Sequence, residues 1–169
     1  MSSLLALATA AQMAFVSNPP MLLVSQTVAQ SVPNSTFTTI TLTNVIYDNY
    51  SGYNTGTSQY TFPVSGWYRV SYTVQWSANA TPARFGGTAN GGSVNMNNTT
   101  TANDLPTASG VTSSVSISSV ISVNQGLTVI DVLGDQNSGA ALNTQVGTSN
   151  LTGYNSYLSV RWINQLTPN

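Results

Sequence analysis

Apolar and polar residues alternate with a period of two through most of the chain after residue 20, and this pattern constrains the fold more than any other. The clearest example is the segment 66–76, GWYRVSYTVQW. In an extended strand, successive side chains point to opposite faces of a sheet. Tyr68 and Val70 therefore share an apolar face. Trp67 and Arg69 share the opposite face, so the segment predicts a strand with one buried and one open side.

Several other segments have strand character and are separated by turns rich in Gly, Asn and Ser. Residues 126–133 are apolar at nearly every position, which suits a strand that is buried on both faces. Residues 78–110 are rich in Asn, Thr and Gly and predict long loops around one short strand at 92–97. The spacing predicts an all-β protein of about eight to ten strands, either a sandwich or a jelly roll. The remaining alternating segments are residues 21–28, 38–42, 111–123 and 154–163.

Uncharged polar residues dominate the composition: Ser, Thr and Asn make up 64 of the 169 residues, whereas only 4% are charged. Ordinary domains carry about 25% charged residues. Apolar residues reach 41%, which argues against intrinsic disorder, and Thr, Val, Ile and Tyr favour strands. So weakly charged a surface suits a protein packed against copies of itself or against a larger body. The alternative is an extracellular β domain kept soluble by hydroxyl and amide groups.

The chain contains no His, Cys, Lys or Glu. The usual zinc, copper and haem ligands are therefore missing, as are a Cys nucleophile, a Ser-His-Asp triad and a phosphate-binding lysine. A net charge of −1 also provides no basic patch for nucleic acid. We therefore expect no catalytic activity, no cofactor and no metal ion.

The four aspartates are scattered along the sequence, which argues against the paired carboxylates of glycoside hydrolysis. Asp48 and Asp135 each lie in an oxygen-rich turn. Calcium usually binds several carboxylates, and each of these turns holds one. Capping of the turn backbone by the Asp side chain is therefore the favoured interpretation of both.

The first segment differs from the rest of the chain, because residues 2–16 are rich in Ala and Leu and contain no Gly, Pro or charge. The apolar residues follow the i, i+3, i+4, i+7 spacing of one helical face, and Asn18-Pro19-Pro20 ends the pattern. A signal peptide would carry a basic region, which is missing, and the segment is too short to span a membrane. The face that we expect to make capsid or trimer contacts consists of Leu4, Leu7, Ala11 and Phe15.

The sequence thus predicts two parts, an N-terminal helical anchor at residues 1–20 and a β domain at residues 21–169. A single helix of this length is marginally stable in water, so it needs a partner. Three partners remain open: sister helices in a bundle, a groove on another protein, and the β domain of the same chain.

Two groups of residues are candidates for contacts on the outer surface. Trp67 and Arg69 share the polar face of their strand, and Arg161 has a similar position in the last strand. Arg and Trp are enriched at binding hot spots. Tyr50 and Tyr53 lie in a segment rich in Asn, Ser and Gly, a composition typical of carbohydrate or protein contact surfaces. The alternatives are a solvent-facing arginine that covers an aromatic ring, and ordinary packing at a sheet edge.

Residues 58–72, SQYTFPVSGWYRVSY, resemble the central signature of the TNF/C1q-like jelly roll, in which Pro-x-x-Gly-x-Tyr leads into an alternating strand. Residues 121–129 resemble the strand, glycine turn and buried strand of that family, and residues 154–162 resemble its last strand. The resemblance implies an antiparallel jelly-roll sandwich that forms homotrimers, with apolar strand faces meeting on a three-fold axis. The chain departs from the family in residues 78–110 and has no cluster of calcium-binding carboxylates.

The order of features along the chain is also similar to that of small jelly-roll proteins of tailed bacteriophages. This resemblance implies a structural virion protein, namely a homotrimeric decoration protein or head fibre on the capsid surface. Its partners would be further copies of the chain and the major capsid protein or another virion protein. The alternative is a minor tail protein, a receptor-binding adhesin that recognises host-surface glycans. Neither function involves nucleic acid or a membrane span.

Overall fold

The residues that the computed structural model describes are 18–79, 84–89, 101–104, 113–124, 126, 129–146 and 156–165. In this part the chain forms thirteen strands and no helix. These residues therefore contain no helical segment that could span a membrane. The predicted N-terminal helix, with Leu4, Leu7, Ala11 and Phe15, lies outside the described residues. The short strand expected at 92–97 lies outside them as well.

The strands differ widely in length, and the longest are β7 and β10. The full set is β1 (Met21–Ser25), β2 (Ser31–Val32), β3 (Thr38–Thr39), β4 (Asn44–Asp48), β5 (Tyr53–Asn54), β6 (Gln59–Thr61), β7 (Gly66–Trp76), β8 (Arg84–Ala89), β9 (Thr101–Asp104), β10 (Ser113–Val123), β11 (Val129–Gln136), β12 (Leu142–Asn143) and β13 (Tyr157–Asn164).

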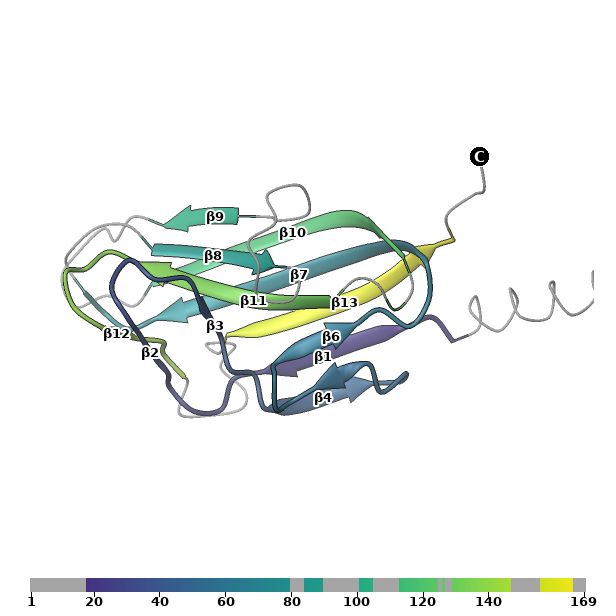
Figure 1. The fold of residues 1–169 in the computed structure, drawn as a ribbon, viewed down its shortest axis with the longest axis horizontal. Helices are drawn as coiled ribbons and strands as arrows, with labels where there is room; N and C mark the ends of the chain where they lie inside the picture. The colour runs from purple at the N-terminus through teal and green to yellow at the C-terminus, as the bar shows by residue number, and fades with distance from the viewer. Residues whose placement is uncertain are drawn as a thin grey trace, which may run out of the picture.

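Two sheets face each other across the core (Figure 1). The five-stranded sheet has the order β10-β7-β13-β1-β4, and the six-stranded sheet has the order β5-β6-β11-β8-β9 with β3 also paired to β11. A small third sheet pairs β12 with β2. From β6 onward the chain passes repeatedly between the two large sheets, and the last strand lies between β1 and β7, as in a jelly roll. The strand pairs are antiparallel, so the predicted all-β antiparallel fold is confirmed.

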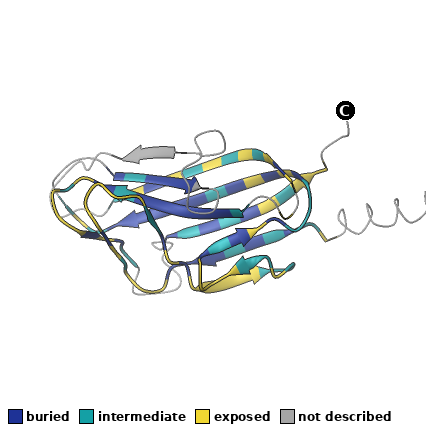
Figure 2. Cartoon of the chain, viewed as in Figure 1, coloured by how far each residue is buried: buried dark blue, intermediate teal, exposed yellow. Residues whose placement is uncertain are grey.

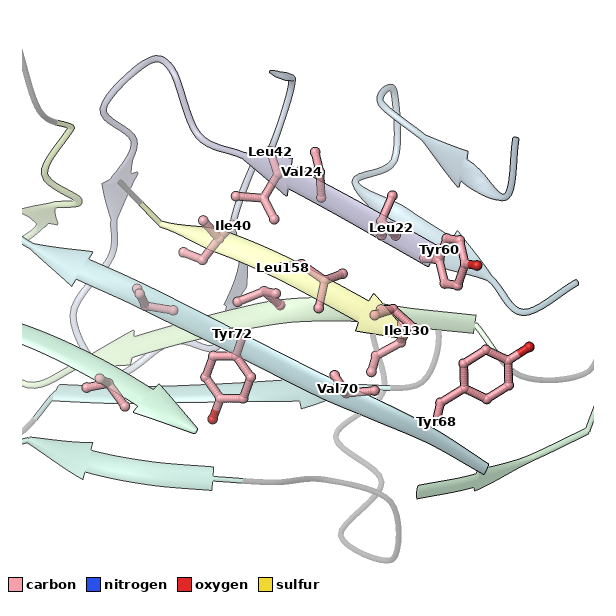
Figure 3. Packing of buried hydrophobic residues seen from close by; sticks show 14 of the residues in the cluster. Leu22, Val24, Ile40, Leu42, Tyr60, Tyr68, Val70, Tyr72, Ile130 and Leu158 are labelled. Carbon is pink, nitrogen blue, oxygen red and sulfur yellow. The ribbon is translucent and has the colours of Figure 1, made fainter. Parts of the chain in front are cut away.

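The core lies between the two large sheets and is rich in aromatic rings. Figure 3 shows Tyr68 and Tyr72 from the five-stranded sheet among aliphatic side chains that include Ile130 from the six-stranded sheet. The ring of Phe62 packs edge-on against Tyr60 at 5.3 Å and against Tyr68 at 4.7 Å between ring centroids. Such contacts stabilise the core beyond the burial of apolar area alone.

Two long strands have the burial that their sequences predict. In β7, Tyr68 is fully buried whereas Trp67 is 42% exposed. In β11, both faces are buried from Ile130 to Leu133, as expected for residues 126–133. The far end of β7 differs, because Gln75 is buried although the alternation places it on the open side. The chain after β12 covers this end, and the Gln145 N–H donates to the Gln75 carbonyl at 2.8 Å.

The region between β7 and β10 contradicts the expectation of long loops around a single strand. Residues 84–89 and 101–104 form β8 and β9, which pair with each other. The glycines of β8 resemble a turn signal in the sequence, but a Cβ on Gly86 would lie 3.0 Å from both the Tyr72 ring and the Val115 side chain. Glycine fits this strand because side chains of the opposite sheet approach its backbone closely.

The structure also adds β4, a strand that the sequence analysis did not predict. β4 is the edge strand of the five-stranded sheet and is exposed at every residue from Asn44 to Tyr47 (Figure 2). An exposed apolar edge strand is a ready site for contacts with another chain.

Gly66, the glycine of the Pro-x-x-Gly-x-Tyr segment, provides a test of this packing. A Cβ at this position would contact the Trp162 indole nitrogen and lie 2.6 Å from the Asn164 carbonyl oxygen, beside the β13 bulge. We expect Gly66→Ala to lower the free energy of unfolding by about 1–3 kcal/mol, as measured by urea denaturation. The control is Gly56→Ala, whose Cβ would meet only the Asn54 side chain at 3.2 Å. Equal stability of the two variants would contradict the close packing at Gly66.

Candidate functional site

The face of the five-stranded sheet that points away from the core carries exposed side chains from several strands, and we name it the open face. Its residues alternate with buried ones along each strand and meet in register across the sheet. Trp67 and Arg69 lie on it together with Arg161, as the sequence indicated. The open face consists of Leu23, Tyr47, Trp67, Arg69, Ser71, Ser118, Val120, Tyr157, Ser159, Arg161 and Ile163.

Exposed apolar side chains concentrate on this sheet. Among the described residues, eight large hydrophobic side chains are exposed, and six of them belong to strands of the five-stranded sheet. The other two, Val28 and Phe37, lie in connecting segments. Four of these six lie on the open face, namely Tyr47, Trp67, Val120 and Ile163, whereas Val45 pairs with the core residue Val24. Exposed apolar area gathered on one face marks an interaction surface. The six are Val45, Ile46, Tyr47, Trp67, Val120 and Ile163.

A ladder of hydroxyl groups crosses the middle of the open face. The Ser71 hydroxyl donates to Ser118 at 2.7 Å, and Thr73 and Ser116 form a hydrogen bond of the same length one row away. Ser159 continues the row of Ser71 on β13. Hydroxyl groups that bond one another are less costly to remove from water than charges, so this part of the face is compatible with burial against another surface.

The sequence analysis did not single out Val45, Ile46 and Val120. A signal for Val120 was present, because it is an apolar residue out of phase with the buried positions Val115 and Val123. Ile163 was placed by alternation on the outward face beside Arg161, and the structure leaves it 46% exposed although the register shifts between Trp162 and Asn164.

Tyr50 and Tyr53 are separated from Trp67 and Arg69. Tyr53 begins β5 of the six-stranded sheet, and its hydroxyl donates to the Leu42 carbonyl at 2.9 Å. Burial raises the pKa of Tyr53 to about 12, a hydrogen bond to Ser58 opposes this rise, and the charge of Asp131 adds to it.

The turn around Tyr50 is held by internal hydrogen bonds. The Tyr50 hydroxyl donates to the Asn18 carbonyl at 3.0 Å. The Asp48 carboxylate accepts the backbone N–H groups of Tyr50 at 3.3 Å and of Tyr53 at 2.9 Å. Asp48 therefore caps its turn, as the sequence indicated. Contacts of the two tyrosines with a glycan remain a prediction.

The tyrosines with a raised pKa and the aspartates do not converge on a site in the described part of the chain. Burial raises the pKa of Tyr60 and of Tyr68, both of which belong to the core. Asp131 is buried on β11, where the Thr39 hydroxyl donates to its carboxylate at 3.0 Å. Within the described residues, no three acidic groups lie close enough together to hold a metal ion.

Comparison with known proteins identifies the fold. No protein family and no curated protein matches the sequence. The solved globular domain of the zebrafish complement 1qA protein superposes with a TM-score of 0.59 at 13% identity, over 87% of this chain and 99% of that one. The chain has the TNF/C1q-like jelly-roll fold. The predicted antiparallel jelly-roll sandwich of the TNF/C1q-like type is thereby confirmed.

Two further solved structures share this jelly roll. Eiger TNF from S. frugiperda has a TM-score of 0.57 at 9% identity, over 88% of this chain and 96% of that one. The vertex protein P5 of the phage PRD1 has a TM-score of 0.57 at 20% identity, over 86% of this chain and 97% of that one. At these identities the likeness concerns the fold alone.

Proposed function

We propose that this chain is a non-catalytic structural protein of a bacteriophage virion, a homotrimer that decorates the capsid surface. The observation that carries the proposal is the group of exposed apolar side chains on the open face, namely Tyr47, Trp67, Val120 and Ile163. The sequence resemblance implies that apolar strand faces of TNF/C1q-like jelly rolls meet on a three-fold axis. The open face supplies such a surface, with an apolar rim and a hydroxyl ladder whose members bond one another.

The position of the N-terminus supports attachment through residues 1–20. Residues 18–20 are fixed to the domain, because the Asn49 amide donates to the Pro19 carbonyl at 2.9 Å and the Trp162 N–H donates to the Pro20 carbonyl at 2.9 Å. The preceding segment therefore starts from the end of the sheet that carries Arg161. An anchor segment joined to the domain at this defined point is suited to link the trimer to a shell.

The fold likeness to a phage vertex protein also supports a place in the virion. The tail adhesin is the less supported alternative. The hydroxyls of Tyr50 and Tyr53 already bond to backbone carbonyls within the domain. A glycan would therefore depend mainly on Trp67 and Arg69, whose face the proposed trimer covers.

The first prediction concerns self-association. Val120 is 51% exposed on the open face and lies opposite Arg69. Val120→Lys adds a cation beside Arg69, and burying this charge in an interface is costly. We expect this variant to sediment as a monomer at concentrations where the unaltered chain is a trimer.

The matched control for self-association is Val28→Lys. Val28 is even more exposed, at 72%, but lies in the segment between β1 and β2 rather than on the open face. This variant should remain trimeric. Dissociation of both variants, or of neither, would contradict an interface on the open face.

The second prediction concerns attachment to the virion. Leu7→Glu and Phe15→Glu place charges on the predicted apolar face of the anchor, so full-length chains with these changes should keep their trimeric mass. Their binding to phage particles lacking the protein should weaken by about tenfold or more, as measured by co-sedimentation. Thr9→Glu, which lies off this face, is the control and should bind normally. Undiminished binding of the Leu7 and Phe15 variants would contradict the anchor.

A further inference from the structure

Arg69 and Arg161 lie directly opposite each other on the neighbouring antiparallel strands β7 and β13. Opposite residues on one face of such a pair have Cβ atoms about 4.5–5.5 Å apart, and like charges placed this way destabilise the sheet. The chain has three arginines and no lysine, so two of its three cationic side chains occupy this one cross-strand position. We name them the arginine pair.

The surroundings of the arginine pair do not relieve the repulsion. The same row of the open face continues with Val120 beside Arg69 and with Met21 beside Arg161, and neither carries a charge. Within the described residues, neither guanidinium forms a hydrogen bond or an ion pair with another side chain.

The four aspartates are occupied or placed elsewhere. Asp48 caps the turn after β4 through two backbone N–H groups. Asp131 and Asp135 lie on β11 and Asp104 on β9, both in the six-stranded sheet. The part of the chain that the structure describes therefore supplies no carboxylate to the arginine pair.

A pocket adjoins the arginine pair. It has a volume of about 250 Å³ and is lined by Arg69, Arg161, Trp162 and Ile163. This volume is several times the ~30 Å³ that a water molecule occupies in the liquid. The two guanidinium groups offer planar arrays of N–H donors, and the indole and the aliphatic side chain form an apolar wall.

We propose that the arginine pair and this pocket form an oxyanion-binding site that takes a phosphate, a sulfate or a carboxylate group. Guanidinium groups bind these oxyanions through paired N–H donors, a geometry that chloride does not match. One bound oxyanion between the two arginines replaces the repulsion with two charge-assisted contacts. Trp162 and Ile163 supply apolar contacts beside the bound group.

Oxyanion binding at this site would favour assembly of the trimer, an inference that rests on the proposed function. If the open face is buried between subunits, two unpaired guanidinium groups per chain lose their hydration, which is costly. An oxyanion taken up with them offsets that cost. Assembly is then linked to oxyanion concentration, because a ligand that binds the assembled form more tightly than the single chain stabilises the assembled form.

The test uses the full-length chain labelled with ¹⁵N. Its three arginines give three side-chain Nε–H signals, and the buried Arg84 serves as an internal control. Phosphate, sulfate and acetate are titrated separately against chloride at matched ionic strength, so that general screening is constant. We expect saturable shifts of the Arg69 and Arg161 signals with at least one oxyanion, and no saturable shift with chloride or at Arg84. Saturation with acetate alone identifies a carboxylate ligand, and saturation with phosphate or sulfate identifies a tetrahedral oxyanion.

Two variants of the pair and one control complete the test. Arg69→Gln and Arg161→Gln should each weaken binding by about tenfold or more, as followed on the remaining arginine. Ser122→Ala, an uncharged change on the same sheet, should bind like the unaltered chain. Equal shifts of the arginine signals in chloride and in the oxyanion salts would overturn the proposal. Shifts of the Arg161 signal that persist unchanged in Arg69→Gln would also overturn it. A chain that binds an oxyanion but stays monomeric contradicts the trimer while supporting the site, so the two failures are distinguishable.

Discussion

The packing of β7 and its neighbours against the six-stranded sheet is the interaction on which the other features of this structure depend. The Tyr72 ring reaches across the core, and its hydroxyl donates to the Gly86 carbonyl on β8 at 2.8 Å. Gly86 has no side chain to keep the two sheets apart. Because the five-stranded sheet turns one set of side chains into this core, its alternate set, with Trp67 and Arg69, must point away from it.

Because the chain has few charged residues, most side chains on the open face can be buried against another protein surface. Hydroxyl pairs such as Ser71 and Ser118 satisfy each other, and Val120 and Trp67 gain from leaving water. Most of the open face can therefore be buried against another copy of the chain at small cost. The exception is the pair formed by Arg69 and Arg161, because burying two like charges is costly. A bound oxyanion would offset this cost, so self-association and oxyanion binding are linked.

Features of the fold and of the site that are set within one segment could be predicted from the sequence. Features that depend on contacts between segments far apart in the sequence could not. The exposure of Trp67 follows from alternation within one segment, and the buried β11 follows from a continuous apolar run. The strand character of β8 could not be predicted, because Gly86 is explained by a ring from a distant strand. The position of Arg69 opposite Arg161 requires the register of β7 and β13, which alternation does not give. Likewise, the inward bond of Tyr53 to Leu42 depends on the packing of the loop.

The central claim is that the open face is covered by other copies of the same chain. Sedimentation equilibrium of the full-length protein at micromolar concentration tests this claim most directly, because it reports the assembled mass without a partner or a label. The account predicts a mass three times the 17.7 kDa of one chain. A stable mass of 17.7 kDa across the concentration range, in both phosphate and chloride buffers, would contradict it.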